Sequence, residues 1–331
     1  MRIRRASIFA AAAAALLSLT ACSAQGGTDP VASEGAAGSP AAEQSSAVDL
    51  TLTTVDGDVD LKAVPERVVV FDYAALDTLH ALGLDDVVVA TPTELLPEHL
   101  SSFKDNPKVA NAGSLKEPDF DAVANAEPDL IIASARSADA VPELQKIAQV
   151  VTLTPDTADY LNSVEERALD LAGVFGKQDA AQAEVDKIQA LRGEIEKLAP
   201  NAGAGLFVSV SGGKLSAYGP GPATRYGFVF DDLGVQSAAP ITSEDRHGQP
   251  ISFEFISEHN PAWMIVMDRD AAIGEQGQSA KEVLSNELVN GTDAAKNNRI
   301  VYISAQEWYL VSGGLTTTQT MLEEAKQALT A

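Results

Sequence analysis

Several residue types that support common chemistries are scarce in this chain of 331 residues. It has a single cysteine, which excludes an internal disulfide and a cysteine-based metal cluster. It has four histidines, too few for a receptor of bare zinc or manganese ions, and no two of them stand at zinc-site spacing. No phosphate-binding loop is present, and Ser209–Gly213 is not the Gly-x-Ser-x-Gly elbow of an α/β hydrolase. We expect a binding protein rather than an enzyme, with no intrinsic cofactor.

Positive charge is scarce as well. The chain has 23 Lys and Arg against 47 Asp and Glu, and without its first 21 residues it keeps 20 against 47, a formal charge near −27. A surface this acidic repels phosphate backbones, so nucleic acid is excluded as a partner. An anionic ligand would need a local cationic cluster that acts against this field. Arginines placed at a crevice are therefore informative.

The amino terminus carries an export signal. Three arginines within the first five residues precede the apolar stretch Ile8–Leu17, which is too short to span a bilayer. The stretch is followed by Leu19–Cys22, a run that resembles a bacterial lipobox, in which the cysteine is lipidated and becomes the first residue of the mature chain. We predict a signal peptide at 1–21 and a lipid anchor on Cys22. The alternative is an ordinary signal peptide beside a stray cysteine.

A polar segment follows the cysteine. Residues 23–47 are mostly Ala, Gly, Ser, Gln and Pro with almost no large apolar side chain, so they cannot bury a core, and we predict a flexible tether at 22–48. In Gram-negative sorting an Asp after the cysteine retains a lipoprotein on the inner membrane, and here that residue is Ser23. A Gram-positive or actinobacterial envelope fits better. We expect a monomer held at the outer face of the cytoplasmic membrane.

One pattern occurs twice in the remaining sequence, at a constant offset of 133 positions. Each copy predicts a short helix, a proline stop, a buried strand and an arginine just past the carboxyl end of the strand, where open α/β sheets bind ligands. The copies run from Phe120 to Arg136 and from Phe253 to Arg269. Two similar lobes would thus each direct a cation at a shared crevice. Coincidence is the alternative, since Pro-Asp before an apolar strand is common in α/β proteins.

Strand and helix patterns alternate on both sides of a long helical segment, which implies mainly parallel sheets. We predict an α/β fold of two doubly wound lobes, at 49–177 and 199–331, joined by a single long rigid helix at 178–198 with the ligand cleft between the lobes. That helix would be about 30 Å long, and a helical strut predicts limited hinge motion. Predicted strands are 67–71, 87–89, 130–133, 150–153, 205–210, 264–267 and 299–303; predicted helices are 74–82, 160–175, 178–198, 223–233, 253–258 and 280–288.

An ordered set of motifs resembles one protein family over nearly the whole chain from about Val48. The motifs are Pro65–Val70, Glu117–Phe120, Arg225–Phe228 with Asp232–Gly234, His247–Ser252, Asp268–Arg269, and Asn297–Tyr302 with Trp308–Leu310. The set is similar to the iron-siderophore substrate-binding lipoproteins of ABC transporters, the subgroup of ferric-catecholate receptors in particular. The resemblance implies a shallow cleft that captures a ferric siderophore, so that Fe(III) enters as part of the ligand. It also implies that the protein delivers this ligand to a membrane permease.

Arginine suits such a cargo on chemical grounds. Three catecholates around ferric iron leave a complex of charge −3, and a guanidinium is always charged, binds paired oxygens in a planar fork and is weakly hydrated. We predict ligand binding by Arg136 and Arg269 from the repeated strand ends and by Arg225 from the segment after a Gly-Pro-rich loop. A matching trio lines the cleft in the subgroup that the chain resembles. The alternative for each is a surface arginine paired with one of the many carboxylates.

The resemblance also points to two possible iron ligands and two aromatic contacts. It places a His and Tyr pair on His247 and Tyr309. A bis-catecholate fills four of the six coordination positions of iron, and this pair would fill the other two. The alternative is a loop histidine and an aromatic residue in the wall of the cleft. Coordination by a trivalent cation would displace the phenol proton at neutral pH. Trp308 and Tyr218 are predicted to pack on catechol rings, with ordinary core packing as an equal alternative.

Acidic residues at matching places in the repeat predict the permease-docking surface. Asp121 and Glu254 each start the helix of their copy, and the transporter class implies one acid on each lobe that meets permease arginines. Helix-dipole stabilisation explains both acids equally well without a partner. Glu117 and Glu244 compete for the docking role.

Two rival functions remain open. A haem or cobalamin receptor would have the same fold, although the arginine trio favours a more anionic cargo. A surface sensor or adhesin would keep the lobes without transport, and neighbouring genes for a permease and an ATPase would separate it from an importer.

Overall fold

The computed structural model describes residues 50–330 apart from 55–56, 223 and 243–246, and these residues lie within one compact unit. The predicted signal peptide, the anchor Cys22 and the tether lie outside the described residues. Within the part that is described, no helix is both long enough and apolar enough to cross a membrane. The chain begins there with a small hairpin of β1 (Thr51–Thr54) and β2 (Gly57–Asp60).

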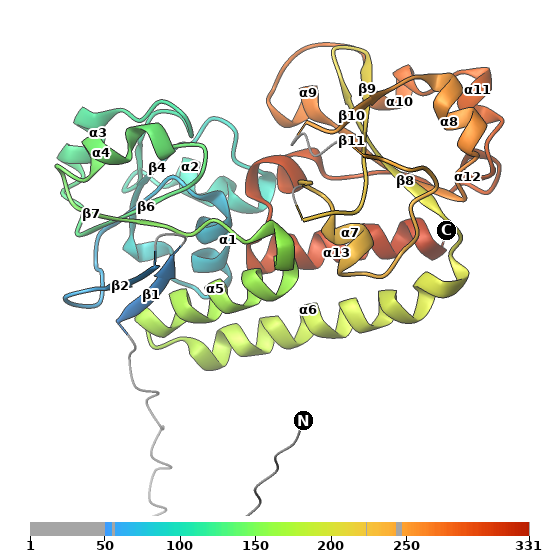
Figure 1. Ribbon diagram of the computed structural model, residues 1–331. Coiled ribbons are helices and arrows are strands. Elements are labelled where there is room, and N and C mark those ends of the chain that lie inside the picture. The colour runs from blue at the N-terminus through green and yellow to red at the C-terminus, as the bar shows by residue number, and fades with distance from the viewer. Residues whose placement is uncertain (1–49, 55–56, 223, 243–246, 331) are drawn as a thin grey trace, which may run out of the picture. The chain divides into compact units, whose positions relative to one another are not determined.

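The first sheet, with its helices, forms the N-terminal lobe (Figure 1). Its strand order is β5-β4-β3-β6-β7, and every pairing is parallel. The strands are β3 (Val68–Val70), β4 (Val88–Thr91), β5 (Ala110–Asn111), β6 (Leu130–Ala133) and β7 (Gln149–Thr152). The helices are α1 (Tyr73–Ala81), α2 (Ser101–Asp105), α3 (Phe120–Asn125) and α4 (Val141–Leu144). The central strands β3 and β6 are buried along their whole length, as expected where helices cover both faces of a parallel sheet.

The second sheet belongs to the C-terminal lobe and has the order β10-β9-β8-β11-β12. Its strands are β8 (Gly205–Ser211), β9 (Lys214–Tyr218), β10 (Gln249–Ile251), β11 (Trp263–Asp268) and β12 (Ile300–Tyr302). Its helices are α7 (Phe228–Asp231), α8 (Phe253–His259), α9 (Arg269–Ala272), α10 (Ala280–Val283), α11 (Glu287–Asn290) and α12 (Asp293–Lys296). Strands β8, β11 and β12 are parallel, whereas β9 and β10 pair antiparallel, and the sequence patterns missed both of these.

Two predicted helices of this lobe are shorter than expected. The helix expected at 223–233 is reduced to α7, because the hydroxyl of Thr224 bonds the carbonyls of Gly219 and Gly221 and holds a turn instead. The helix expected at 280–288 is interrupted before α11, since the side chain of Asn286 caps a new helix by accepting the N–H groups of Leu288 and Val289.

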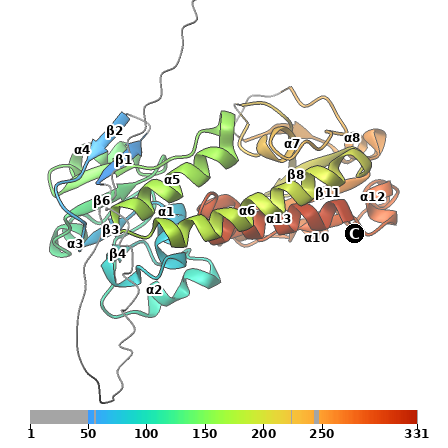
Figure 2. The ribbon, with the colours of Figure 1, turned by 90° about the horizontal axis from the view of Figure 1, so that it is seen from below.

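The connecting helix lies where it was predicted, but it is not the only helix that spans the two lobes. Helix α6 (Gln178–Leu198) follows α5 (Tyr160–Val174), and the C-terminal helix α13 (Leu315–Thr330) runs beside α6 in both views (Figures 1 and 2). Helix α13 contacts α1 of the N-terminal lobe and β11 and β12 of the C-terminal lobe. The chain therefore passes from one lobe to the other through the predicted helix α6, and the last helix packs beside it and contacts both lobes as well.

One hydrophobic core extends through both lobes. Side chains from one face of each sheet, such as Val70 and Ile132 in one and Phe207 and Ile265 in the other, belong to the same buried cluster as α5, α6 and α13. The opposite faces form separate clusters, one in each lobe. This alternation follows from the period-two geometry of strands. A shared core is costly to separate, which supports limited hinge motion.

The N-terminal lobe also holds the start of α13 through Asp77, a fully buried residue of α1. Its carboxylate accepts the backbone N–H groups of Thr316 and Thr317 at 2.9 and 3.1 Å, and accepts from His99 at 2.9 Å. The second ring nitrogen of His99 lies 3.6 Å from the carboxylate of Glu307. We call these residues, Asp77, His99 and Glu307 with the first turn of α13, the Asp77 clasp.

Candidate functional site

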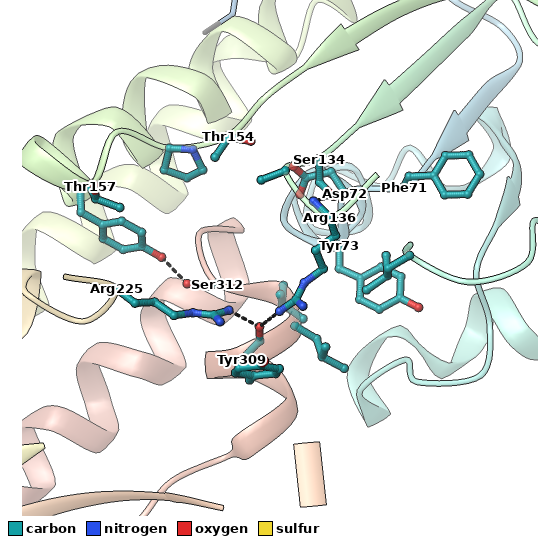
Figure 3. Close-up of a pocket in the computed structure, with 16 residues that line it drawn as sticks. Phe71, Asp72, Tyr73, Ser134, Arg136, Thr154, Thr157, Arg225, Tyr309 and Ser312 are labelled. Atoms are coloured by element: carbon teal, nitrogen blue, oxygen red, sulfur yellow. Dashed lines mark hydrogen bonds between the residues drawn. The ribbon is translucent and has the colours of Figure 1, made fainter. Parts of the chain in front are cut away.

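Two adjoining hollows lie between the lobes, where the cleft was predicted, and residues of both lobes line each of them. The first has a volume of about 180 Å³ and extends from Asp72 to Arg225 (Figure 3). The second has a volume of about 240 Å³ and extends from Lys116 to Arg269. The residues that line both are Tyr73, Leu115, Arg136, Tyr309 and Leu310. The lining is largely apolar, and its charged side chains are the arginines and Lys116 together with Asp72 in the first hollow and Glu94 in the second.

All three predicted arginines reach these hollows. Arg136 lies in the turn that follows β6, where the backbone N–H of Ser134 donates to the hydroxyl of Ser137 and closes the turn. Arg269 is the first residue of α9 and follows β11 directly. Both strands lie inside their sheets, and the carboxyl ends of parallel strands are where open α/β sheets bind ligands. Arg225 does not follow a strand of this kind and lies instead in the turn between β9 and α7.

The three guanidiniums meet around one residue, Tyr309. Arg136 and Arg225 each donate from Nη2 to the Tyr309 carbonyl oxygen at 2.5 Å (Figure 3). Arg269 donates from Nε to the Tyr309 hydroxyl at 3.2 Å. Their Cζ atoms lie 4.3 Å (Arg225), 4.8 Å (Arg136) and 5.5 Å (Arg269) from the centroid of the tyrosine ring, within the range of cation–π attraction. We call these four residues the arginine cluster.

The positive charge of the cluster is not neutralised by ion pairs. Among residues 50–330 as described, none of the three arginines forms a salt bridge with a carboxylate. Burial and the neighbouring charge of Arg225 lower the pKa of Arg136. Burial acts in the same direction on Arg225, but nearby phenol groups, led by Tyr226, outweigh it and raise its pKa. The cluster is thus a concentration of positive charge that no carboxylate among the described residues pairs with.

The same charges change the acidity of the central phenol. Burial raises the pKa of Tyr309, but the hydrogen bond from Arg269 and the positive charges of the three arginines outweigh it, and the pKa lies below its ordinary value. The phenol of Tyr309 therefore loses its proton more easily than that of a free tyrosine.

A π-helical turn, Glu307–Val311, presents Tyr309 to both lobes. The turn ends at Ser312, whose φ of 45° lies in the left-handed region and stops the helix before α13 begins. Carbonyls near the end of a helix lack intrahelical partners and carry the negative end of its dipole. This explains why the carbonyl of Tyr309 accepts two cationic side chains at once.

The structure places the two predicted aromatic contacts in the core. Trp308 is 0% exposed and donates its indole N–H to Glu324, while its ring packs near Phe207, Tyr226 and Phe228. Tyr218 is 4% exposed and meets Phe207 and Tyr226 edge to face. The alternative of ordinary core packing, which the sequence left open, describes both rings. Neither ring is among the residues that line the two hollows, so their role as catechol contacts stays a prediction.

His247 does not join the arginine cluster in this structure. It is exposed at a turn before β10 and is not among the residues that line either hollow. Its neighbour Gly248, with φ of 79°, lies so close to the Tyr218 ring that a Cβ there would meet it at 3.2 Å. Among the described residues, no group of three or more His, Cys, Asp and Glu side chains is placed to hold a metal ion.

The acidic pair lies at matching positions, as the repeat predicts. Asp121 is the second residue of α3 and Glu254 the second residue of α8, and both are exposed. Acceptance of backbone and Ser252 hydrogen bonds lowers the pKa of Glu254. Of the competing acids, Glu117 is exposed, and Glu244 lies outside the described residues.

Sequence reasoning missed several residues that line the hollows. Asp72 follows β3, the strand next to β6, so the rule that found Arg136 could have found it too. Lys116 adds a third cation at the second hollow, beside Arg136 and Arg269, but lies in a loop without a periodic signal. Tyr73 lines both hollows with its hydroxyl directed to the carbonyl of Pro92, at 2.9 Å.

Comparison with known proteins gives consistent relatives. The petrobactin-binding protein YclQ of Bacillus subtilis is 42% identical over 266 residues, which cover 80% of this chain and 83% of that protein. The ferric-anguibactin-binding protein FatB of Vibrio anguillarum is 30% identical over 265 residues, covering 78% and 81%. The crystal structure of the catecholate-siderophore-binding protein VctP from Vibrio cholerae matches with a TM-score of 0.77 at 31% identity, covering 83% of this chain and 98% of that one.

The model of one family matches residues 68–307, which include the three arginines and almost all of both sheets. These relatives are named as binding proteins for petrobactin, ferric anguibactin and a catecholate siderophore, and this confirms the prediction of a binding protein rather than an enzyme. The predicted α/β fold of two lobes is confirmed by the same likeness. The chain belongs to the periplasmic binding protein family.

Proposed function

We propose that the chain is the extracytoplasmic substrate-binding component of an ABC importer and that it captures an anionic ferric siderophore of the catecholate class. The observation that carries the proposal is the arginine cluster. It draws guanidiniums from both lobes to one tyrosine, and no carboxylate among the described residues pairs with them. In a chain of formal charge −24, three such arginines without a carboxylate partner among the described residues point to a ligand that supplies the negative charge.

Siderophore chemistry matches this arrangement. Ferric iron prefers anionic oxygen ligands, and its tris-catecholate complex carries a charge of −3. Guanidiniums bind paired oxygens through parallel hydrogen bonds and stack on aromatic rings, so they suit the oxygens and the rings of a catecholate alike. The apolar lining supplied by Leu115 and Leu310 would cover ring edges between the charged contacts. Petrobactin, anguibactin and catecholate siderophores are the ligands named for the three relatives.

A ligand panel tests the proposal. Quenching of protein fluorescence would be titrated with ferric bis-catecholate, ferric tris-catecholate, ferric hydroxamate, haem and cobalamin. We expect both catecholates to bind at least about 100-fold more tightly than the neutral or weakly charged ligands, since each good charge-assisted contact contributes about 1.5–3 kcal/mol. Tighter binding of haem or cobalamin would show that the protein is a receptor for that ligand and not for a siderophore. Binding of none of the five ligands would favour a surface sensor or adhesin.

Tyr309 and His247 form the second part of the proposal. A bis-catecholate fills four of the six positions around iron, and we propose that the phenolate of Tyr309 and the imidazole of His247 supply the other two. The lowered pKa of Tyr309 and its place in both hollows support its half of the pair. His247 would have to move from the exposed turn to the ligand.

The double variant His247→Ala with Tyr309→Phe separates the two chelates. We expect it to weaken a ferric bis-catecholate at least about 100-fold and a tris-catecholate less than about 5-fold, because only the former leaves iron positions open. Tyr309→Phe keeps the ring and the backbone carbonyl that Arg136 and Arg225 bind. A charge-transfer band unique to the bis-catecholate complex would mark phenolate ligation, and equal losses for both chelates would contradict direct coordination.

The permease would meet the exposed acids of the two lobes. We propose docking through Asp121 and Glu254, which occupy the same helical position in α3 and α8 and would suit a channel of two matching subunits. The helix dipole accounts for the acids equally well, so the test must separate docking from folding.

Reversing both charges, as Asp121→Lys with Glu254→Lys, is expected to abolish siderophore-dependent growth or iron uptake in cells while affinity in solution stays within about 2-fold. The control is Glu184→Lys, another exchange of charge, on α6. Loss of affinity in the double variant would show that these acids support the fold instead of a partner.

A lipid anchor at Cys22 completes the proposal. The anchor and the tether at 22–48 would hold the protein at the outer face of the cytoplasmic membrane beside the permease, in a Gram-positive or actinobacterial envelope. Both segments lie outside the described residues, and metabolic labelling with a fatty-acid probe, compared with Cys22→Ser, tests the anchor.

A further inference from the structure

We propose that Asp72 is a proton-binding residue of the ligand site: its carboxyl takes up one proton when an anionic chelate enters the first hollow, keeps that proton, and donates a hydrogen bond through it to a ligand oxygen. The inference rests on the proposed function, because it requires a negatively charged ligand in this hollow. It assigns a proton-binding carboxyl to a ligand site whose other proposed contacts are arginines and tyrosine.

The position of Asp72 follows from the sheet topology. The strand order β5-β4-β3-β6-β7 reverses its direction of growth between β3 and β6, which makes the edge above these two strands the switch point of the sheet. Asp72 follows β3 and Arg136 follows β6. The two residues therefore face the same crevice, and Figure 3 shows Asp72 and Ser134 beside the base of the Arg136 side chain.

Asp72 also caps α1, and this use leaves part of its carboxylate available. One oxygen, Oδ1, accepts the backbone N–H groups of Ala74 and Ala75 at 2.8 and 3.3 Å. The side chain is 6% exposed, and among the residues the structure describes it has no ion pair with a cation. If the first hollow binds an anion, as proposed above, the negative charge of the ionised Asp72 carboxylate would repel that ligand.

The groups that face Asp72 from the packed elements do not remove this conflict. Arg136 faces it from the turn after β6, and Arg167 and Tyr160 face it from α5. Burial is the largest effect on the carboxyl, and although the two backbone N–H groups and both arginines act against it, burial raises the pKa of Asp72 to about 6. The carboxyl is thus close to accepting a proton before any ligand is present.

A chelate of charge −3 in the same hollow adds a like charge and raises the pKa of Asp72 further. Where the bound pKa exceeds the free pKa, the complex holds more protons than its parts, so affinity rises as pH falls through the bound pKa. The gain stops below about 6, where the free protein is protonated too. Between these limits we expect affinity to rise by up to about 10-fold for each pH unit lost.

Calorimetry with preformed ferric tris-catecholate tests the proposal. Titrations of the full mature protein at pH 7.0, in buffers of different ionisation enthalpy, give the number of protons exchanged. We expect an uptake of more than half a proton for the unaltered protein and none for Asp72→Asn. Asparagine caps helices as well as aspartate does, so the variant keeps α1, and it should bind at least about 5-fold more tightly at pH 8. The control Asp179→Asn removes an exposed charge from α6 and should keep the uptake.

The possible results of these titrations distinguish the role of Asp72 from the proposed function. Tight binding without proton uptake, or an uptake that persists in Asp72→Asn, overturns the role of Asp72 and leaves the proposed function intact. Release of a proton, the opposite sign, assigns the exchange to ionisation of a phenol such as Tyr309 and also overturns the proposal. Absence of any binding heat at all pH values, with no fluorescence response to the chelate, overturns the proposed function and this inference with it.

Discussion

Replacing Arg136 and Arg225 together by methionine is expected to weaken the binding of a ferric tris-catecholate at least about 1000-fold. Each arginine lies in the first hollow, and truncating one partner of a buried charged hydrogen bond costs about 2 kcal/mol or more, so two such losses reach about 4 kcal/mol. Methionine preserves much of the side-chain volume and removes only the charge and the donors. Fluorescence quenching or calorimetry at constant ionic strength measures the change.

The same variant is expected to be more resistant to unfolding without ligand than the unaltered protein. Two guanidiniums share one carbonyl oxygen, and burial together with the charge of Arg225 lowers the pKa of Arg136, so the charged form of Arg136 is disfavoured there, although phenol groups raise the pKa of Arg225. Arg192→Met is the control, since Arg192 pairs with Glu196 on the exposed side of α6. A double variant that loses affinity only in step with a lower melting temperature would count against a binding role.

Replacing Asp77 by alanine is expected to lower the free energy of unfolding by about 3–5 kcal/mol, the range for removing one partner from a buried charged network. The change leaves the backbone N–H groups of Thr316 and Thr317 and the ring of His99 without their acceptor. Urea unfolding followed by circular dichroism measures it. Asp77→Asn, which keeps one acceptor oxygen, should lose less than half as much.

A glycine beside the clasp offers an independent variant. A Cβ built at Gly314 would meet the Asp77 carboxylate oxygen at 2.1 Å and its Cβ at 2.5 Å, far inside contact distance. Gly314→Ala should therefore destabilise the protein although it removes no hydrogen bond. Full stability of both Asp77→Ala and Gly314→Ala would show that the clasp does not hold α13 to the N-terminal lobe.

The clasp also predicts a loss of stability at alkaline pH. Burial lowers the pKa of His99, but its hydrogen bond to Asp77 and the nearby carboxylate of Glu307 outweigh this and raise the pKa to about 9, above the ordinary value of 6.5. A raised histidine pKa stabilises the fold fully below about 6.5, and this contribution is lost as pH rises through about 9. His99→Gln should remove this part of the pH dependence in thermal unfolding.

Local patterns in the sequence were enough for much of the fold. Apolar strands such as Leu130–Ala133 and the alternating charges and alanines of α6 carry their own signals, and those elements lie where they were predicted. The repeat located Arg136 and Arg269 for the same reason, because strand, turn and arginine are close in sequence in each copy. Arg225 and Tyr309 were found through resemblance to a family, without a local geometric reason.

Other features depend on residues far apart in sequence. Strand β9 pairs with the edge of β8, and β10 pairs with the edge that β9 offers in turn. Helix α13 is held to the N-terminal lobe by Asp77, which accepts N–H groups about 240 positions away. The sequence does not distinguish Trp308 and Tyr218 from aromatic residues that contact a ligand. Only their packing against Phe207 shows that they belong to the core.

The sequence by itself determined the two-lobed α/β plan, the connecting helix and the arginines that the lobes contribute, since each rests on periodicity or motif within a short stretch. Only the tertiary structure decided that the three guanidiniums converge on the carbonyl, ring and hydroxyl of Tyr309, that Asp72 shares their hollow, and that His247 lies outside it. The physical reason is that a binding site is made where distant segments meet, and the distances between them are fixed by the shared core rather than by any one segment.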